Sequence, residues 1–144
     1  MPKNYELTNI GKLENVINHS FLLPDSQKTI FGKMFLNDDI TLSGCEISFN
    51  AFTPGQFVPF NHKHTKHEET YIFLGGSGEF EVDGETIEVK EGSVINLQPE
   101  AIRNICNTSK DTILQFIVIQ TKKDSMNSVK LTQDGVGVSP RGSW

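Results

Sequence analysis

The chain has 144 residues and a net charge of −5 at neutral pH, a length that fits one domain with a hydrophobic core. No run of lysine or arginine forms a basic stripe, which argues against a nucleic acid as partner. The longest aliphatic and aromatic run, 116–119, is too short to cross a bilayer, and the first residues lack the apolar segment of a secretory signal. Cys45 and Cys106 are isolated, as expected in a reducing compartment. We therefore expect a cytoplasmic protein that binds neither nucleic acids nor membranes.

Residues 1–40 are expected to form an N-terminal extension of the domain. Within it, residues 13–19 are compatible with a turn of helix, and residues 32–36 with an edge strand. Small open barrels leave strand edges that favour covering by another chain. We therefore expect this extension to contact a second copy of the chain in a homodimer.

Residues 41–121 alternate short strand-like runs with Gly, Pro, Asn and Asp. Residues 46–52 alternate polar with apolar side chains and end at Pro54-Gly55, which is typical of a half-buried strand before a turn. Asp83-Gly84 separates two further runs and predicts a type I′ hairpin, whose two central residues need positive φ. About eight such strands predict an all-β sandwich or barrel. Strands are also expected at 69–74, 93–97, 102–107 and 112–121, before a polar C-terminal tail over 122–144.

Three of the four histidines, His62, His64 and His67, lie within six residues, and Glu68 and Glu69 follow at once. Imidazole and carboxylate are the ligands of many zinc, iron, manganese and nickel sites. On a β-strand, His62 and His64 would point the same way, about 6 to 7 Å apart. Both can then bind one divalent transition metal ion, with Glu69 as the third ligand and His67 as a candidate extra ligand. The alternative is a solvated loop with ordinary surface histidines.

Aromatic side chains surround this cluster in the sequence. Glu69, Tyr71 and Phe73 share one face of their predicted strand, which would place a carboxylate at the rim of a cavity and two rings below it. With Phe60, these rings are candidates for binding a substrate. The alternative for Tyr71 and Phe73 is simple packing in the core.

The spacing of these residues resembles the first motif of the cupin family. That motif has a glycine, His-x-His, four residues, a glutamate, six residues and a glycine; here these are Gly55, His62, His64, Glu69 and Gly76, with Gly55 one residue further upstream than usual. The second cupin motif is similar at Gly92, near Pro99 and at Asn107. The resemblance covers about residues 41–121. It implies a double-stranded β-helix, a jelly-roll-like barrel, with the site inside its mouth.

The second motif departs from the family at two positions. Glu100 stands where the family usually has glycine, and Arg103 where it has a fourth ligand, a histidine. A guanidinium group offers no lone pair and cannot bind the metal. If His62, His64 and Glu69 still hold an ion with open positions, Arg103 is a candidate for orienting an anionic substrate. If Arg103 instead pairs with Glu69, its charge opposes the metal; a third alternative places Arg103 on the outer face.

The sequence therefore predicts a metal-binding cupin that acts on a small molecule, an organic acid or a carbonyl compound. Cupin relatives include dioxygenases, isomerases, decarboxylases and lyases, so the fold does not choose the reaction. The alternative is a non-enzymatic ligand-binding or sensory cupin that has lost its metal because of Arg103. A weaker alternative is an interaction protein in which the histidine cluster contacts a partner.

Overall fold

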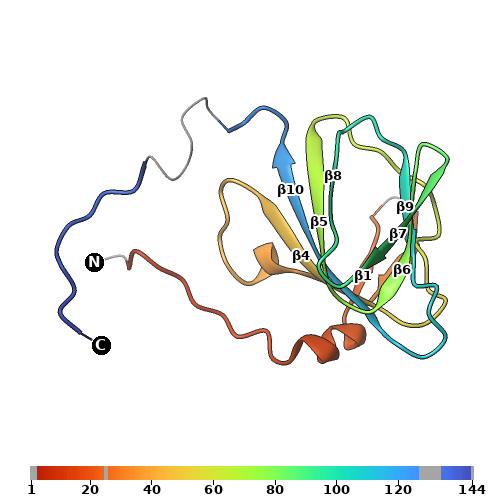
Figure 1. Ribbon diagram of the computed structural model, residues 1–144, viewed down its shortest axis with the longest axis horizontal. Helices are drawn as coiled ribbons and strands as arrows, with labels where there is room; N and C mark the ends of the chain where they lie inside the picture. Colours follow the sequence, from red (N-terminus) through yellow and green to blue (C-terminus); the bar gives the residue numbers. More distant parts are fainter. Residues whose placement is uncertain (1–2, 25, 127–133, 144) are drawn as a thin grey trace.

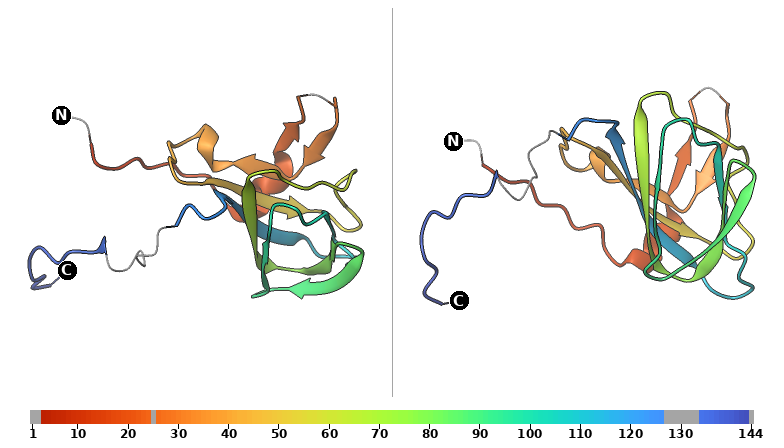
Figure 2. Two further views of the ribbon diagram at one scale, coloured as in Figure 1. Left: turned by 90° about the horizontal axis from the view of Figure 1, so that it is seen from above. Right: turned by 45° about the horizontal axis from the view of Figure 1, so that its top comes forward.

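The computed structural model describes residues 3–24, 26–126 and 134–143. Part of the predicted C-terminal tail, 127–133 and 144, therefore lies outside the described residues. Residues 134–143 are exposed throughout and run outside the barrel (Figures 1 and 2).

The described residues form β-strands and two short 3-10 helices, and no α-helix, which confirms the predicted all-β class. The first 3-10 helix lies where the sequence indicates a turn of helix. The elements are η1 (Leu13–Asn18), β1 (Ser20–Leu22), β2 (Thr29–Phe31), β3 (Lys33–Phe35), η2 (Leu36–Asp38), β4 (Glu46–Phe52), β5 (His67–Gly75), β6 (Ser77–Val82), β7 (Glu85–Lys90), β8 (Val94–Leu97), β9 (Arg103–Cys106) and β10 (Leu114–Lys122).

The strands form two facing antiparallel sheets and a separate hairpin. A five-stranded sheet has the order β3-β4-β10-β5-β8, and a three-stranded sheet has the order β7-β6-β9. The hairpin of β1 and β2 lies at one end of the barrel (Figure 2). Successive side chains of a strand point to opposite faces of its sheet, and the inner faces of the two sheets are turned toward each other. Side chains from both sheets therefore fill the space between them. This core includes Phe52, Phe73, Phe80, Leu114 and Phe116.

The turn between β6 and β7 confirms the predicted hairpin. Val82 pairs with Glu85, which leaves Asp83 and Gly84 as the two central residues. Their φ angles are 50° and 86°, as a type I′ turn requires. The short turn keeps β6 and β7 in register, and β6 in turn pairs with β9, the strand that begins at Arg103.

Gly76, between β5 and β6, has a structural role that can be tested. Its φ is 81°, and a Cβ there would collide with the backbone carbonyl oxygen of Ile113 and lie 3.0 Å from Leu114 Cα. Gly84 has a similar φ of 86° but no heavy atom within 4 Å of a Cβ. The positive φ alone costs about 1–2 kcal/mol for alanine, and overpacking adds about 1–3 kcal/mol. We expect Gly76→Ala to lower the free energy of unfolding in guanidinium chloride clearly more than Gly84→Ala. Equal losses in the two variants would contradict this role.

Candidate metal centre

The segment that carries His62 and His64 is not a strand, so that part of the sequence prediction was wrong. It is an extended loop between β4 and β5. Only a few of its residues make backbone hydrogen bonds to β9 and to the residues that precede β9. His62 and Arg103 exchange backbone hydrogen bonds of 3.2 and 3.0 Å, and the His64 N–H donates to the Pro99 carbonyl at 2.9 Å. Pro59, lacking an N–H, interrupts any longer ladder. The two imidazoles nevertheless face one cavity, as the spacing of two residues predicts.

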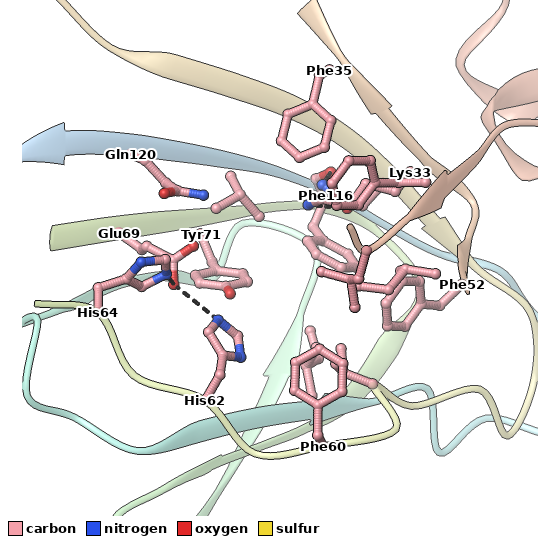
Figure 3. A pocket seen from close by; sticks show the side chains of 17 residues that line it. Lys33, Phe35, Phe52, Phe60, His62, His64, Glu69, Tyr71, Phe116 and Gln120 are labelled. Carbon is pink, nitrogen blue, oxygen red and sulfur yellow. Dashed lines mark hydrogen bonds and ion pairs between the residues drawn. The ribbon is translucent and has the colours of Figure 1, made fainter. Parts of the chain in front are cut away.

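Glu69 lies near the start of β5, opposite Gln120 of β10 and Leu97 of β8, and is 3% exposed. Its Oε1 atom is 3.6 Å from His62 Nε2 and 3.1 Å from His64 Nε2 (Figure 3). The ligand atoms of these three residues all lie within 4.8 Å of one another. Ligands at about 2.0–2.2 Å from an ion lie about 3.0–3.5 Å apart when they are neighbours. The three residues can therefore hold one metal ion with little rearrangement.

Buried polar atoms of the candidate ligands that make no hydrogen bond are also consistent with a metal site. Within the described residues, His64 Nε2 and Glu69 Oε1 are buried and, although they lie 3.1 Å apart, make no contact with hydrogen-bond geometry. Buried polar atoms are rarely left unpaired without a reason, and both are atoms that bind transition metals. The His62 and His64 side chains remain 29% and 24% exposed, so an ion held by them would keep positions open toward the cavity.

Arg103, the first residue of β9, points into the barrel and is 1% exposed. The outer-face alternative was therefore wrong. Its Nη2 donates a hydrogen bond to the Gln98 carbonyl at 2.8 Å, and its Nη1 lies 3.3 Å from Glu69 Oε1. Arg103 thus approaches the same carboxylate oxygen as the two imidazoles.

These contacts determine the charge state of Glu69. Burial favours the neutral acid and raises its pKa, but the polar contacts with His62 and His64 and the charges of His64 and Arg103 outweigh burial and hold the pKa at about 2. The carboxylate is therefore ionised at ordinary pH, as a metal ligand must be. Burial also raises the pKa of Tyr71 far above its usual range, so Tyr71 presents a neutral phenol to the site.

The low pKa of Glu69 predicts an acid-dependent contribution to stability. Because the folded-state pKa is about 2 and the ordinary value 4.5, the stabilisation is complete above about pH 4.5 and is lost as the pH falls toward 2. In chelator-treated protein, the difference in unfolding free energy between wild type and Glu69→Gln should shrink over this range. Glu100→Gln, at an exposed glutamate, is the control and should show no such trend. A Glu69 difference that stays constant with pH would contradict the assignment.

The three candidate ligands open onto a cavity of about 180 Å³ inside the barrel (Figure 3). Two residues predicted to bind substrate, Phe60 and Tyr71, line it. Two others, Arg103 and Phe73, do not; Phe73 is 1% exposed and packs against Phe116 in the core. His67 is exposed at the start of β5 and lies outside the group. The lining residues are Phe21, Leu23, Ile30, Lys33, Phe35, Asn50, Phe52, Val58, Phe60, His62, His64, Glu69, Tyr71, Ile105, Phe116, Val118 and Gln120.

The sequence patterns did not point to three polar residues that line the cavity: Lys33, Asn50 and Gln120. One pattern could have indicated Lys33: it directly precedes two apolar residues, Met34 and Phe35, in a predicted strand. Because side chains alternate along a strand, Lys33 and Phe35 share one face. Asn50 and Gln120 lie on β4 and β10 with no distinctive spacing. Only the pairing of distant strands brings these three side chains to the same cavity.

The comparisons with known proteins agree with this geometry. The family model of the cupin domain matches residues 49–120. The crystal structure of a cupin protein from Bacteroides fragilis is 30% identical, with a TM-score of 0.75, and the match covers 96% of this chain and 100% of that chain. The chain therefore belongs to the cupin family, and its barrel is the predicted double-stranded β-helix.

Two further solved structures are similar over less of the sequence or at lower identity. A predicted oxalate decarboxylase from Thermotoga maritima is 28% identical with a TM-score of 0.51, covering 54% of this chain and 65% of that chain. A Cupin 2 conserved barrel domain protein from Salinispora arenicola is 19% identical with a TM-score of 0.62, covering 82% and 92%. A search of curated proteins found no match. Among the described residues, no helix has the length and apolar character needed to span a membrane.

Proposed function

We propose that this cupin binds one divalent transition metal ion through His62, His64 and Glu69 and acts on a small organic acid. The observation that carries the proposal is the convergence of two imidazole nitrogens on Glu69 Oε1, at 3.6 and 3.1 Å. Two histidines and a carboxylate suit zinc, iron, manganese or nickel. When bound, such an ion would act as a Lewis acid and polarise an oxygen atom of the bound acid. The type of reaction, whether that of a dioxygenase, an isomerase or a lyase, depends on the functional groups of the bound acid as well as on the residues of the site.

The charges around the cavity favour an anionic ligand. Arg103 contacts the centre and Lys33 lines the cavity, whereas Glu69 is the carboxylate among the lining residues. A divalent ion would add two positive charges to this set. In a partly buried cavity, uncompensated charge is costly, so an occupied centre favours a bound anion. This supports an organic acid over a neutral carbonyl compound, and the similar structure from Thermotoga maritima is described as a predicted oxalate decarboxylase.

The remaining residues of the site have distinct roles in this proposal. Arg103, held by the Gln98 carbonyl, positions the carboxylate of Glu69 rather than contacting the ligand. Phe60 and Tyr71 form apolar walls that exclude water from the bound acid. His62 and His64 each supply one ring nitrogen as a ligand of the metal.

Arg103 also favours a second candidate function, a non-enzymatic ligand-binding or sensory cupin. Its Nη1 already lies 3.3 Å from the oxygen that a metal would use. A divalent ion about 5 Å from the guanidinium would meet repulsion on the order of several kcal/mol at an effective dielectric near 20. In that case Arg103 itself balances Glu69, and the cavity binds an acid without a metal.

Elemental analysis of protein purified without chelator and without added metal tests the proposal. Close to one divalent ion per chain supports the metal centre, whereas metal-free protein that still binds small acids supports the second candidate. Homodimer formation and a cytoplasmic location stay predictions from the sequence, because the structure is that of a single chain.

A further inference from the structure

Lys33 is held in place on the cavity wall by buried polar partners. It begins β3, the edge strand of the five-stranded sheet, and pairs with Asn50 of β4. Its ammonium group donates hydrogen bonds to Ser48 Oγ at 2.9 Å and Asn50 Oδ1 at 3.1 Å. Asn50 Nδ2 also donates to Ser48 Oγ at 3.1 Å, which fixes the orientation of the amide. Ser48 and Asn50 are 2% and 4% exposed, so Lys33 is anchored from inside the sheet.

These contacts leave the ammonium group with a donor and a charge that no carboxylate balances directly. Lysine has three N–H donors; Ser48 and Asn50 take two, and the Phe35 ring, whose centre lies 4.9 Å from Nζ, offers no oxygen to the third. None of the ion pairs within the described part of the chain involves Lys33. Burial lowers its pKa to about 8, while the charges of Glu69 and Glu46 act in the opposite direction. At neutral pH Lys33 is thus mainly a cation in a partly buried position, where an anion would bind by a charge-assisted hydrogen bond.

Lys33 and the metal centre face the same cavity from two sides. The strand order places three strand spacings between β3 and β5, and the register places Lys33 level with Phe73, four residues along β5 from Glu69. Both side chains reach inward from these positions (Figure 3). Tyr71, Phe116 and Val118 line the cavity from β5 and β10, between β3 and the metal centre. A molecule that reaches both sides therefore has a polar group at each end and an apolar middle.

We propose that Lys33 binds the carboxylate of a short elongated acid, whose opposite end carries a carbonyl or hydroxyl oxygen placed at His62, His64 and Glu69. The placement of the opposite end rests on the proposed function, whereas carboxylate binding by Lys33 does not. The cavity of about 180 Å³ is smaller than the roughly 300–1,000 Å³ of pockets for drug-sized ligands. The acid is therefore a short chain rather than a multi-ring compound.

Levulinate, a short acid with a ketone toward its far end, and its neutral amide form a matched pair of probes. By titration calorimetry, wild type should bind the acid at least about tenfold more tightly than the amide, as expected for a hydrogen bond to a charged group. Lys33→Met should abolish this preference, and Lys33→Arg, which keeps the charge, should restore part of it. Lys28→Met is the control. Lys28 is exposed and its Nζ lies 5.4 Å from the centre of the Phe60 ring, so this variant removes the same charge beside the cavity and should leave the preference unchanged.

Each arm is measured with metal-loaded and with chelator-treated protein, so that the two proposals fail separately. A Lys33-dependent preference in chelator-treated protein supports the role of Lys33 independently of the metal, whereas wild type that takes up no metal when metal is added overturns the metal centre alone. Metal-loaded protein whose preference is unchanged by Lys33→Met, or reduced equally by Lys28→Met, overturns the role of Lys33. A measurement on wild type needs no variant to fold: levulinate should slow acetylation of Lys33 by acetic anhydride and leave Lys28 unaffected. Equal acetylation of Lys33 with and without levulinate would also overturn the role of Lys33.

Discussion

The double variant His62→Ala, His64→Ala is expected to contain almost no divalent metal when purified beside wild type that contains close to one ion per chain. The variant retains one carboxylate, Glu69, and its Oε1 lies 3.3 Å from Arg103. Loss of a single outer-shell partner typically costs 10–100-fold in metal affinity, so loss of two direct ligands should cost more than about a hundredfold. Elemental analysis by mass spectrometry measures the metal content of both proteins.

The same chain supplies a control for this experiment in His67. Like His62 and His64 it is a histidine of this short segment, but it is exposed and lies outside the candidate ligand group. His67→Ala should therefore keep the wild-type metal content. Added metal at a hundred times its dissociation constant should also stabilise wild type and His67→Ala by about 2.7 kcal/mol, and leave the double variant unchanged. Undiminished metal in the double variant would place the ion elsewhere, and wild type that stays metal-free after metal addition would favour the non-enzymatic cupin.

Replacement of Arg103 by methionine is expected to have the second large effect, on stability. It leaves the Glu69 carboxylate, 3% exposed, without its guanidinium partner, and breaking a buried pair in this way typically costs about 3–5 kcal/mol. The double variant Glu69→Gln, Arg103→Met removes both charges and should recover most of the loss. Unfolding in urea of chelator-treated proteins measures the three free energies relative to wild type.

An exposed ion pair between the loop before β5 and the loop before β9 is a matched control. Lys63 Nζ lies 3.2 Å from Glu100 Oε2, and the two side chains are 54% and 77% exposed. Exposed pairs contribute about 0–1 kcal/mol, so Lys63→Met should have little effect. Divalent metal should stabilise Arg103→Met more than it stabilises wild type, because the ion takes over the role of the missing cation without repulsion from it. A loss below about 1 kcal/mol in Arg103→Met would contradict a buried pair.

The parts of the fold that follow local rules were predicted correctly. The Asp83-Gly84 turn requires two positive φ angles, which the two residues adopt, and alternation along residues 46–52 identifies β4. The convergence of His62 and His64 was also predicted, although their segment is an extended loop. Two intermittent backbone contacts, to Arg103 and Pro99, give the same alternation of side chains that a continuous strand would give.

The parts that depend on pairing between distant segments could not be predicted from local patterns. The inward orientation of Arg103 follows from pairing of β9 with β6 and from the bridge to His62. Phe73 shares a strand face with Tyr71, yet only Tyr71 lines the cavity, whereas Phe73 is 1% exposed and packs in the core. Lys33 becomes part of the site only because β3 pairs with β4, and β4 in turn pairs with β10.

The position of β10 has a consequence for how the protein folds. It is the last strand of the described residues along the chain, but it lies at the centre of the five-stranded sheet between β4 and β5. During synthesis, β4 and β5 cannot join into one sheet until residues up to Lys122 have left the ribosome. Because contacts between distant residues slow folding, we expect the five-stranded sheet to stay open until β10 inserts between β4 and β5.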